Sequence, residues 1–113
     1  MSRTGRNYNP YRRRALAEVK KLAGRIRRKF HPKQIFLFGS LARGDMHALS
    51  DIDLVIIADF EGSRRDRVEQ ILDIAQALNM SFPVEPLPLR PEEFNVLRQK
   101  PFFKHIAREA LKL

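Results

Sequence analysis

The sequence has no cysteine, and none of its apolar stretches approaches the length that crosses a membrane. Without cysteine there are no disulfide bonds to indicate export, and the first residues lack the basic, apolar and small-residue pattern of a secretory leader. The longest apolar run, residues 54–58, has the length of a β-strand, whereas a membrane-spanning helix needs about 18 apolar residues. These absences predict a cytoplasmic protein with no membrane attachment.

Acidic residues are almost missing from the first 34 residues. This segment holds twelve lysines and arginines and one acid, Glu18, for a charge of +11, while the other 79 residues carry 10 basic and 12 acidic side chains. An anionic partner such as RNA would therefore dock at the N-terminal end and not over the whole surface. The alternative is that the charges only form the solvated face of a helix.

The length of 113 residues fits one domain with a single core. Residues 1–10 show no apolar period and contain Gly5 and Pro10, so we expect a flexible basic N-terminal arm there. Residues 11–113 then form the domain. Apolar residues at three- and four-residue steps predict helices from Tyr11 to about residue 30, after Ser63 to about residue 78, and from Pro91 onward to Leu111 with a break at Pro101.

Three segments have the composition of strands: residues 35–38, 51–58 and 82–89. The third contains three prolines, which cannot donate to a ladder, so it should lie at a sheet edge. In the second, alternation places Asp51, Asp53 and Val55 on one face and the apolar residues between them on the other, which we expect to face the core.

Asp51 and Asp53 are candidate metal ligands. Two residues apart on a strand, their backbones are separated by about 7 Å and their side chains leave the same face. Carboxylates this close repel each other unless a positive charge lies between them, and Mg²⁺ in phosphate chemistry is commonly held by one or two carboxylates. A divalent cation would therefore stabilise the pair.

A second group of candidates follows the first strand. Gly39 lets a ligand approach the backbone, Ser40 can donate its hydroxyl proton to a phosphate oxygen, and Arg43 can add a charged donor. Ser50 either contributes to this nucleotide site, caps the turn before Asp51, or faces water. The pattern predicts that a polyphosphate binds beside the metal.

The order of these residues, "FGSLARGDMHALSDIDLVI" over residues 38–56, resembles the minimal nucleotidyltransferases of the DNA polymerase beta-like superfamily. The resemblance covers roughly Ile26 to Leu113. It implies an α/β (α+β) fold with a small, mixed, largely antiparallel sheet flanked by helices. It also implies transfer of a nucleoside monophosphate from an NTP, ATP being the expected donor, to a hydroxyl of a protein or RNA, with Mg²⁺ or Mn²⁺ as cofactor.

That family also has a third carboxylate on a later strand, and the matching residue here is Glu85. Glu85 would bind a metal or accept the proton of the acceptor hydroxyl. The alternative for Glu85 is a solvent-facing charge on an edge strand. Minimal members of the family are commonly antitoxins that neutralise a helical nuclease of the HEPN type, so a binding module with little catalysis is the competing function.

Overall fold

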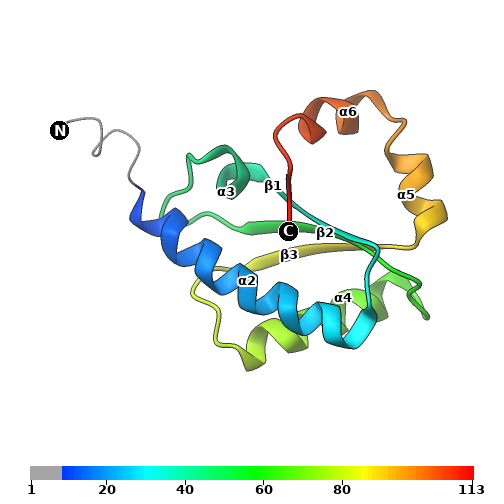
Figure 1. Ribbon diagram of the computed structural model, residues 1–113, viewed down its shortest axis with the longest axis horizontal. Coiled ribbons are helices and arrows are strands. Elements are labelled where there is room, and N and C mark those ends of the chain that lie inside the picture. The colour runs from blue at the N-terminus through cyan, green and yellow to red at the C-terminus, as the bar shows by residue number, and fades with distance from the viewer. Residues whose placement is uncertain (1–8) are drawn as a thin grey trace.

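The sheet in the computed structural model, which describes residues 9–113, has four strands in the order β3-β2-β1-β4 (Figure 1). The strands are β1 (Gln34–Phe38), β2 (Ile52–Ile57), β3 (Val84–Leu89) and β4 (Leu111–Lys112). β1 pairs antiparallel with both β2 and β4, whereas β2 and β3 are parallel. The expected mixed, largely antiparallel sheet is therefore confirmed.

Five helices accompany the sheet within the described residues: α2 (Pro10–Phe30), α3 (Gly39–Arg43), α4 (Arg64–Ala77), α5 (Pro91–Leu97) and α6 (Pro101–Ala107). Ser63 caps α4 as predicted, since its hydroxyl accepts from the Asp66 amide and the Asp66 carboxylate accepts from the Ser63 amide. Proline occupies the first turn of α2, α5 and α6, where no intrahelical donor is lost. No helix in residues 9–113 combines the length and apolarity needed to cross a membrane.

α2 is a core helix with a basic outer face. Of the apolar stripe that the spacing predicts, Val19, Leu22, Ala23 and Ile26 are buried, whereas Leu16 and Phe30 are half-buried. The Asn9 side chain caps the helix by accepting from the Arg12 amide and also donates to the Met46 carbonyl at 2.8 Å. Arg12 Nε donates to the Leu41 carbonyl at 2.9 Å, so Arg12 fastens the start of α2 to α3. Residues 1–8, most of the expected arm, lie outside the described residues.

Both faces of the sheet are covered, which corrects the expectation of a single apolar face on β2. Figure 1 shows α2 and α4 on one side of the sheet and α5 and α6 on the other. On the first side Ile52, Leu54 and Ile56 join the main core. On the second side Val55 and Ile57 belong to a smaller cluster that includes Phe103 of α6. The face that carries Asp53 is therefore partly roofed by the C-terminal helices.

Two local predictions were wrong. Residues 110 and 111 were expected in a helix, but α6 ends at Ala107 and Leu111–Lys112 pair with β1, whose outer edge they satisfy. In α4 the three- and four-residue apolar spacing predicts that Leu72 is buried with Val68, Ile71, Ala75 and Leu78, but Leu72 is exposed, and Arg67 is buried in that helix instead. The prediction that the proline-rich strand lies at an edge was correct, since β3 ends the sheet.

Candidate active site

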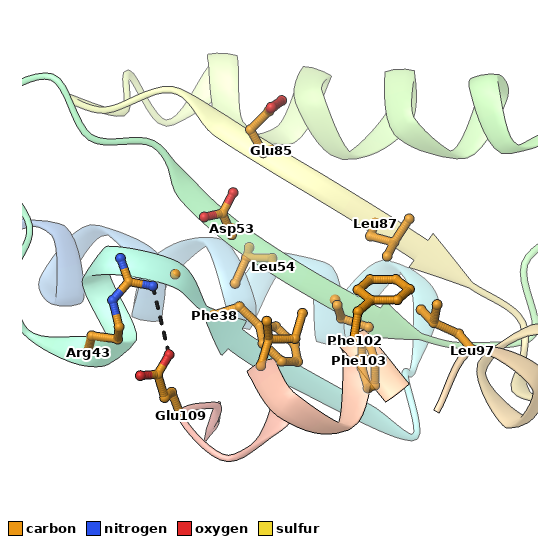
Figure 2. Close-up of a pocket in the computed structure, with 13 residues that line it drawn as sticks. Phe38, Arg43, Asp53, Leu54, Glu85, Leu87, Leu97, Phe102, Phe103 and Glu109 are labelled. Carbon is orange, nitrogen blue, oxygen red and sulfur yellow. Dashed lines mark ion pairs between the residues drawn. The ribbon is translucent and has the colours of Figure 1, made fainter. Parts of the chain in front are cut away.

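Strand pairing brings Asp53 and Glu85 together. In the ladder Asp53 lies opposite Glu85 on β3 and opposite Phe38 on β1. Neighbouring strands are about 4.8 Å apart, and both residues line the same pocket, where Figure 2 shows them on adjacent strands. Two of the three predicted acids are therefore adjacent on one face of the sheet.

The backbone of Gly39 lies directly against the side chain of Asp53. Its φ of +73° lies in the left-handed region, where residues with a Cβ are strained. A Cβ built at this position would overlap Oδ2 of Asp53, so no other residue fits without moving that carboxylate. The glycine is thus required both by the turn from β1 into α3 and by the position of Asp53.

The pocket has a volume of about 330 Å³ and lies between the sheet and the C-terminal helices. Of the residues that the sequence proposes for the site, Gly39, Arg43, Asp53 and Glu85 line this pocket. Asp51, Ser40 and Ser50 are not among the lining residues. Asp51 is exposed just before β2, where its charge still acts on Asp53.

The charged residues around Asp53 affect its pKa in opposite directions. Partial burial, followed by the negative charges of Asp51 and Glu85, raises the pKa of Asp53 above its ordinary value, while Arg43 acts in the opposite direction. Arg43 contacts Asp45 at 3.2 Å and Glu109 at 3.9 Å. The site therefore holds more negative than positive charge, as a site for a cation would.

Ser50 has a local role. Its buried hydroxyl accepts from the His47 amide at 2.9 Å, and its own amide donates to the His47 carbonyl. Ser50 thus caps the turn that leads to Asp51, the second of the three alternatives that the sequence left open.

The carboxylates of Asp51, Asp53 and Glu85 do not converge on one point in this structure. Within residues 9–113 no group of three or more histidine, cysteine, aspartate or glutamate residues is arranged so as to hold a metal ion. The donor chemistry nevertheless fits Mg²⁺, because Asp53, Glu85 and Asp51 offer only the oxygen ligands that this ion prefers. The sequence did not predict that Glu109 and apolar residues of α5 and α6 line the site, because no local pattern in these segments indicates that they lie opposite β2.

The chain is similar to known proteins in sequence and in fold. The family described as "Nucleotidyltransferase domain" matches residues 19–110. A solved structure of a protein from Sulfolobus solfataricus, provisionally assigned as a nucleotidyltransferase, is 24% identical with a TM-score of 0.58 and covers 75% of both chains. A second structure, a toxin-antitoxin with AMP-PNP, is 23% identical with a TM-score of 0.57 and covers 85% of this chain and 69% of that one. None of the curated proteins compared with the chain matches it.

Proposed function

The chain belongs to the nucleotidyltransferase domain family, and from this premise we propose that it is a metal-dependent nucleotidyltransferase. It transfers a nucleoside monophosphate from an NTP to a hydroxyl group of a protein or RNA. The acceptor oxygen forms a bond to the α-phosphorus, the bond from that phosphorus to the bridging oxygen breaks, and pyrophosphate leaves. The proton of the acceptor passes to a base in the site.

One observation carries the proposal: Asp53 lies beside Glu85 on the neighbouring strand and against Gly39, in a pocket. Paired carboxylates on a half-buried sheet face cost stability, as the raised pKa of Asp53 indicates. A purely structural sheet has no need of such a pair. A site that binds a divalent cation and a polyphosphate does.

Asp53, Glu85 and Asp51 would hold the metal, which would be Mg²⁺ or Mn²⁺. Bound there, the ion would neutralise charge that develops on the attacking and leaving oxygens. Glu85, which is exposed and lines the pocket, would serve as a metal ligand or as the base. Arg43 would exchange its weak contact with Glu109 for a phosphate oxygen of the NTP.

The experiment measures NTP binding by calorimetry with Mg²⁺ and label transfer from each labelled NTP in a cell lysate. Asp51→Asn with Asp53→Asn should abolish metal-dependent binding, whereas Glu85→Gln should leave binding nearly intact and lower transfer. Asp59→Asn is the matched control, because Asp59 is an exposed acid beyond the other end of β2. Equal NTP affinity in the double variant and the control would refute the site.

A second candidate function is an antitoxin-type module that binds a helical nuclease of the HEPN type with little or no catalysis. Val96 and Phe102 on the C-terminal helices are each 62% exposed, which is unusual for large apolar side chains and fits a protein partner. The similar structure described as a toxin-antitoxin agrees with this reading. Retained binding to such a partner without label transfer to any acceptor would favour the module over the enzyme.

A further inference from the structure

We propose that the apolar end of the pocket is a nucleobase site, in which Phe102 stacks on a purine ring and selection depends on ring size and not on hydrogen-bond pattern. The inference rests on the proposed function, because it concerns the donor NTP of that reaction. It adds the part of the substrate that the site recognises besides phosphate and metal.

The pocket has two chemically different ends. The charged side chains Arg43, Asp53, Glu85 and Glu109 gather at one end, and Figure 2 shows the labelled apolar side chains of β3, α5 and α6 toward the other. This apolar end is lined by Leu87, Leu97, Phe102 and Phe103. A nucleotide has the same division, with charged phosphates at one end and a planar ring at the other. The volume of about 330 Å³ lies in the range of small-molecule sites.

Phe102 and Phe103 are neighbours with different environments. Phe103 is 5% exposed and packs against Phe38 and Phe94, with ring centroids 5.6 and 5.8 Å away. Phe102 is 62% exposed and has no aromatic partner among the described residues, although it lines the pocket. The core therefore uses Phe103, and the ring of Phe102 retains a face that a ligand can cover.

Among residues 9–113, the side chains that line the apolar end have no group that could form a hydrogen bond with the edge of a base. The four labelled side chains that line it are hydrocarbons, and Glu109 contacts Arg43 at the opposite end (Figure 2). Sites without hydrogen-bonding groups discriminate weakly between ligands of the same shape. Stacking accepts every base, because each has a π-face, and a purine covers more of the ring than a pyrimidine. ATP and GTP should therefore bind alike, and both better than CTP.

The test measures Mg²⁺-dependent binding of ATP, GTP, CTP and inorganic tripolyphosphate to the full chain by calorimetry. Phe102→Leu keeps an apolar side chain but removes the ring, and Phe102→Tyr keeps the ring. Tyr11→Leu is the control, since Tyr11 is an exposed aromatic residue on α2 that does not line the pocket. Because Phe102 is exposed, all variants should melt at the wild-type temperature.

We expect Phe102→Leu to weaken ATP and GTP binding about ten-fold, which corresponds to the loss of one base–aromatic stack. Tripolyphosphate affinity should be unchanged, and Phe102→Tyr and Tyr11→Leu should bind ATP within about two-fold of wild type. In the wild type, ATP and GTP should differ by less than about five-fold.

Three results would overturn the inference. Unchanged ATP affinity in Phe102→Leu, with tripolyphosphate still bound, would remove the base site and leave the proposed function intact. A preference of a hundred-fold for one purine, on the order of what hydrogen-bonded recognition gives, would contradict selection by ring size. Unchanged ATP affinity together with reduced label transfer would assign Phe102 to the acceptor. Failure of both ATP and tripolyphosphate to bind would overturn the proposed function itself.

Discussion

The close approach of Gly39 to Asp53 gives a quantitative prediction for Gly39→Ala. Holding alanine at a φ of +73° costs about 1–2 kcal/mol. The new methyl group overlaps the Asp53 carboxylate, and turning that side chain off its rotamer adds about 1 kcal/mol. The free energy of unfolding should fall by about 2–3 kcal/mol, which lowers Tm by about 10–15 °C in a domain of this size.

Gly24→Ala is the matched control. Gly24 lies inside α2, and a Cβ there meets no atom within 4 Å. Since alanine is the better helix former, this variant should be more stable by about 0.5–1 kcal/mol. Urea denaturation monitored by circular dichroism measures both variants. Loss of metal-dependent NTP binding in Gly39→Ala, with binding kept in Gly24→Ala, would connect the packing of Gly39 to the site.

The steric contribution can be separated by repeating Gly39→Ala in an Asp53→Ala background. Without the carboxylate only the backbone cost of about 1–2 kcal/mol should remain. An equal loss in both backgrounds would show that the two residues do not contact each other. A wild-type stability of Gly39→Ala would refute the reasoning as a whole.

Three other changes test the charges of the protein. Because the pKa of Asp53 is raised by burial and by neighbouring carboxylates, its stabilising contribution is complete below its ordinary value of 3.8 and is lost as the pH rises through the raised pKa; Asp53→Asn should therefore gain stability over wild type between acid and neutral pH, and a pH-independent difference in urea denaturation would contradict this. Arg67, whose side chain is 6% exposed, contacts Glu93 at 2.7 Å, so Arg67→Met should cost about 2–3 kcal/mol in the same assay and Glu93→Gln should recover part of it; a neutral Arg67→Met would show that the pair contributes nothing. Arg27→Gln with Arg28→Gln, on the exposed face of α2, should leave unfolding unchanged and reduce the log–log salt slope of single-stranded RNA binding by about 1.4, whereas an unchanged slope would make this face merely solvated.

The local parts of the site followed from the sequence. Gly39 after an apolar strand, and acids at alternate positions of the next, are patterns within a few residues of each other, so periodicity and turn chemistry predict them. Glu85 could be placed on an edge strand because prolines restrict where a strand lies. The resemblance to a family matched Glu85 to a third carboxylate, but the register that places it opposite Asp53 joins segments 32 residues apart, and no local pattern could determine it.

The missed features are contacts between distant segments. The sequence around residue 55 does not predict that α6 covers the second face of β2, because a valine is common both in strands with one covered face and in strands with two. Arginine is a residue type that usually lies at the surface. Arg67 is buried because its guanidinium donates to Glu93 and to the carbonyls of Gly62 and Pro88. Leu111 continued an apolar helical spacing, but the free edge of β1 gave its backbone better partners.

The prolines of β3 have a consequence for how this protein can assemble. The Ile52 amide donates to the Pro83 carbonyl, and the Ala58 amide donates to the Leu89 carbonyl. The backbone amide and carbonyl groups of the odd-numbered residues in this segment therefore point toward β2, and the nitrogens of Pro86 and Pro88 point away from the sheet. The outer edge of β3 therefore presents almost no amide protons with which another chain could form a backbone ladder, and this disfavours amyloid-like stacking of copies. A partner at this edge must therefore be recognised by side chains, and one substitution there could end the association where a shared backbone ladder would have tolerated it.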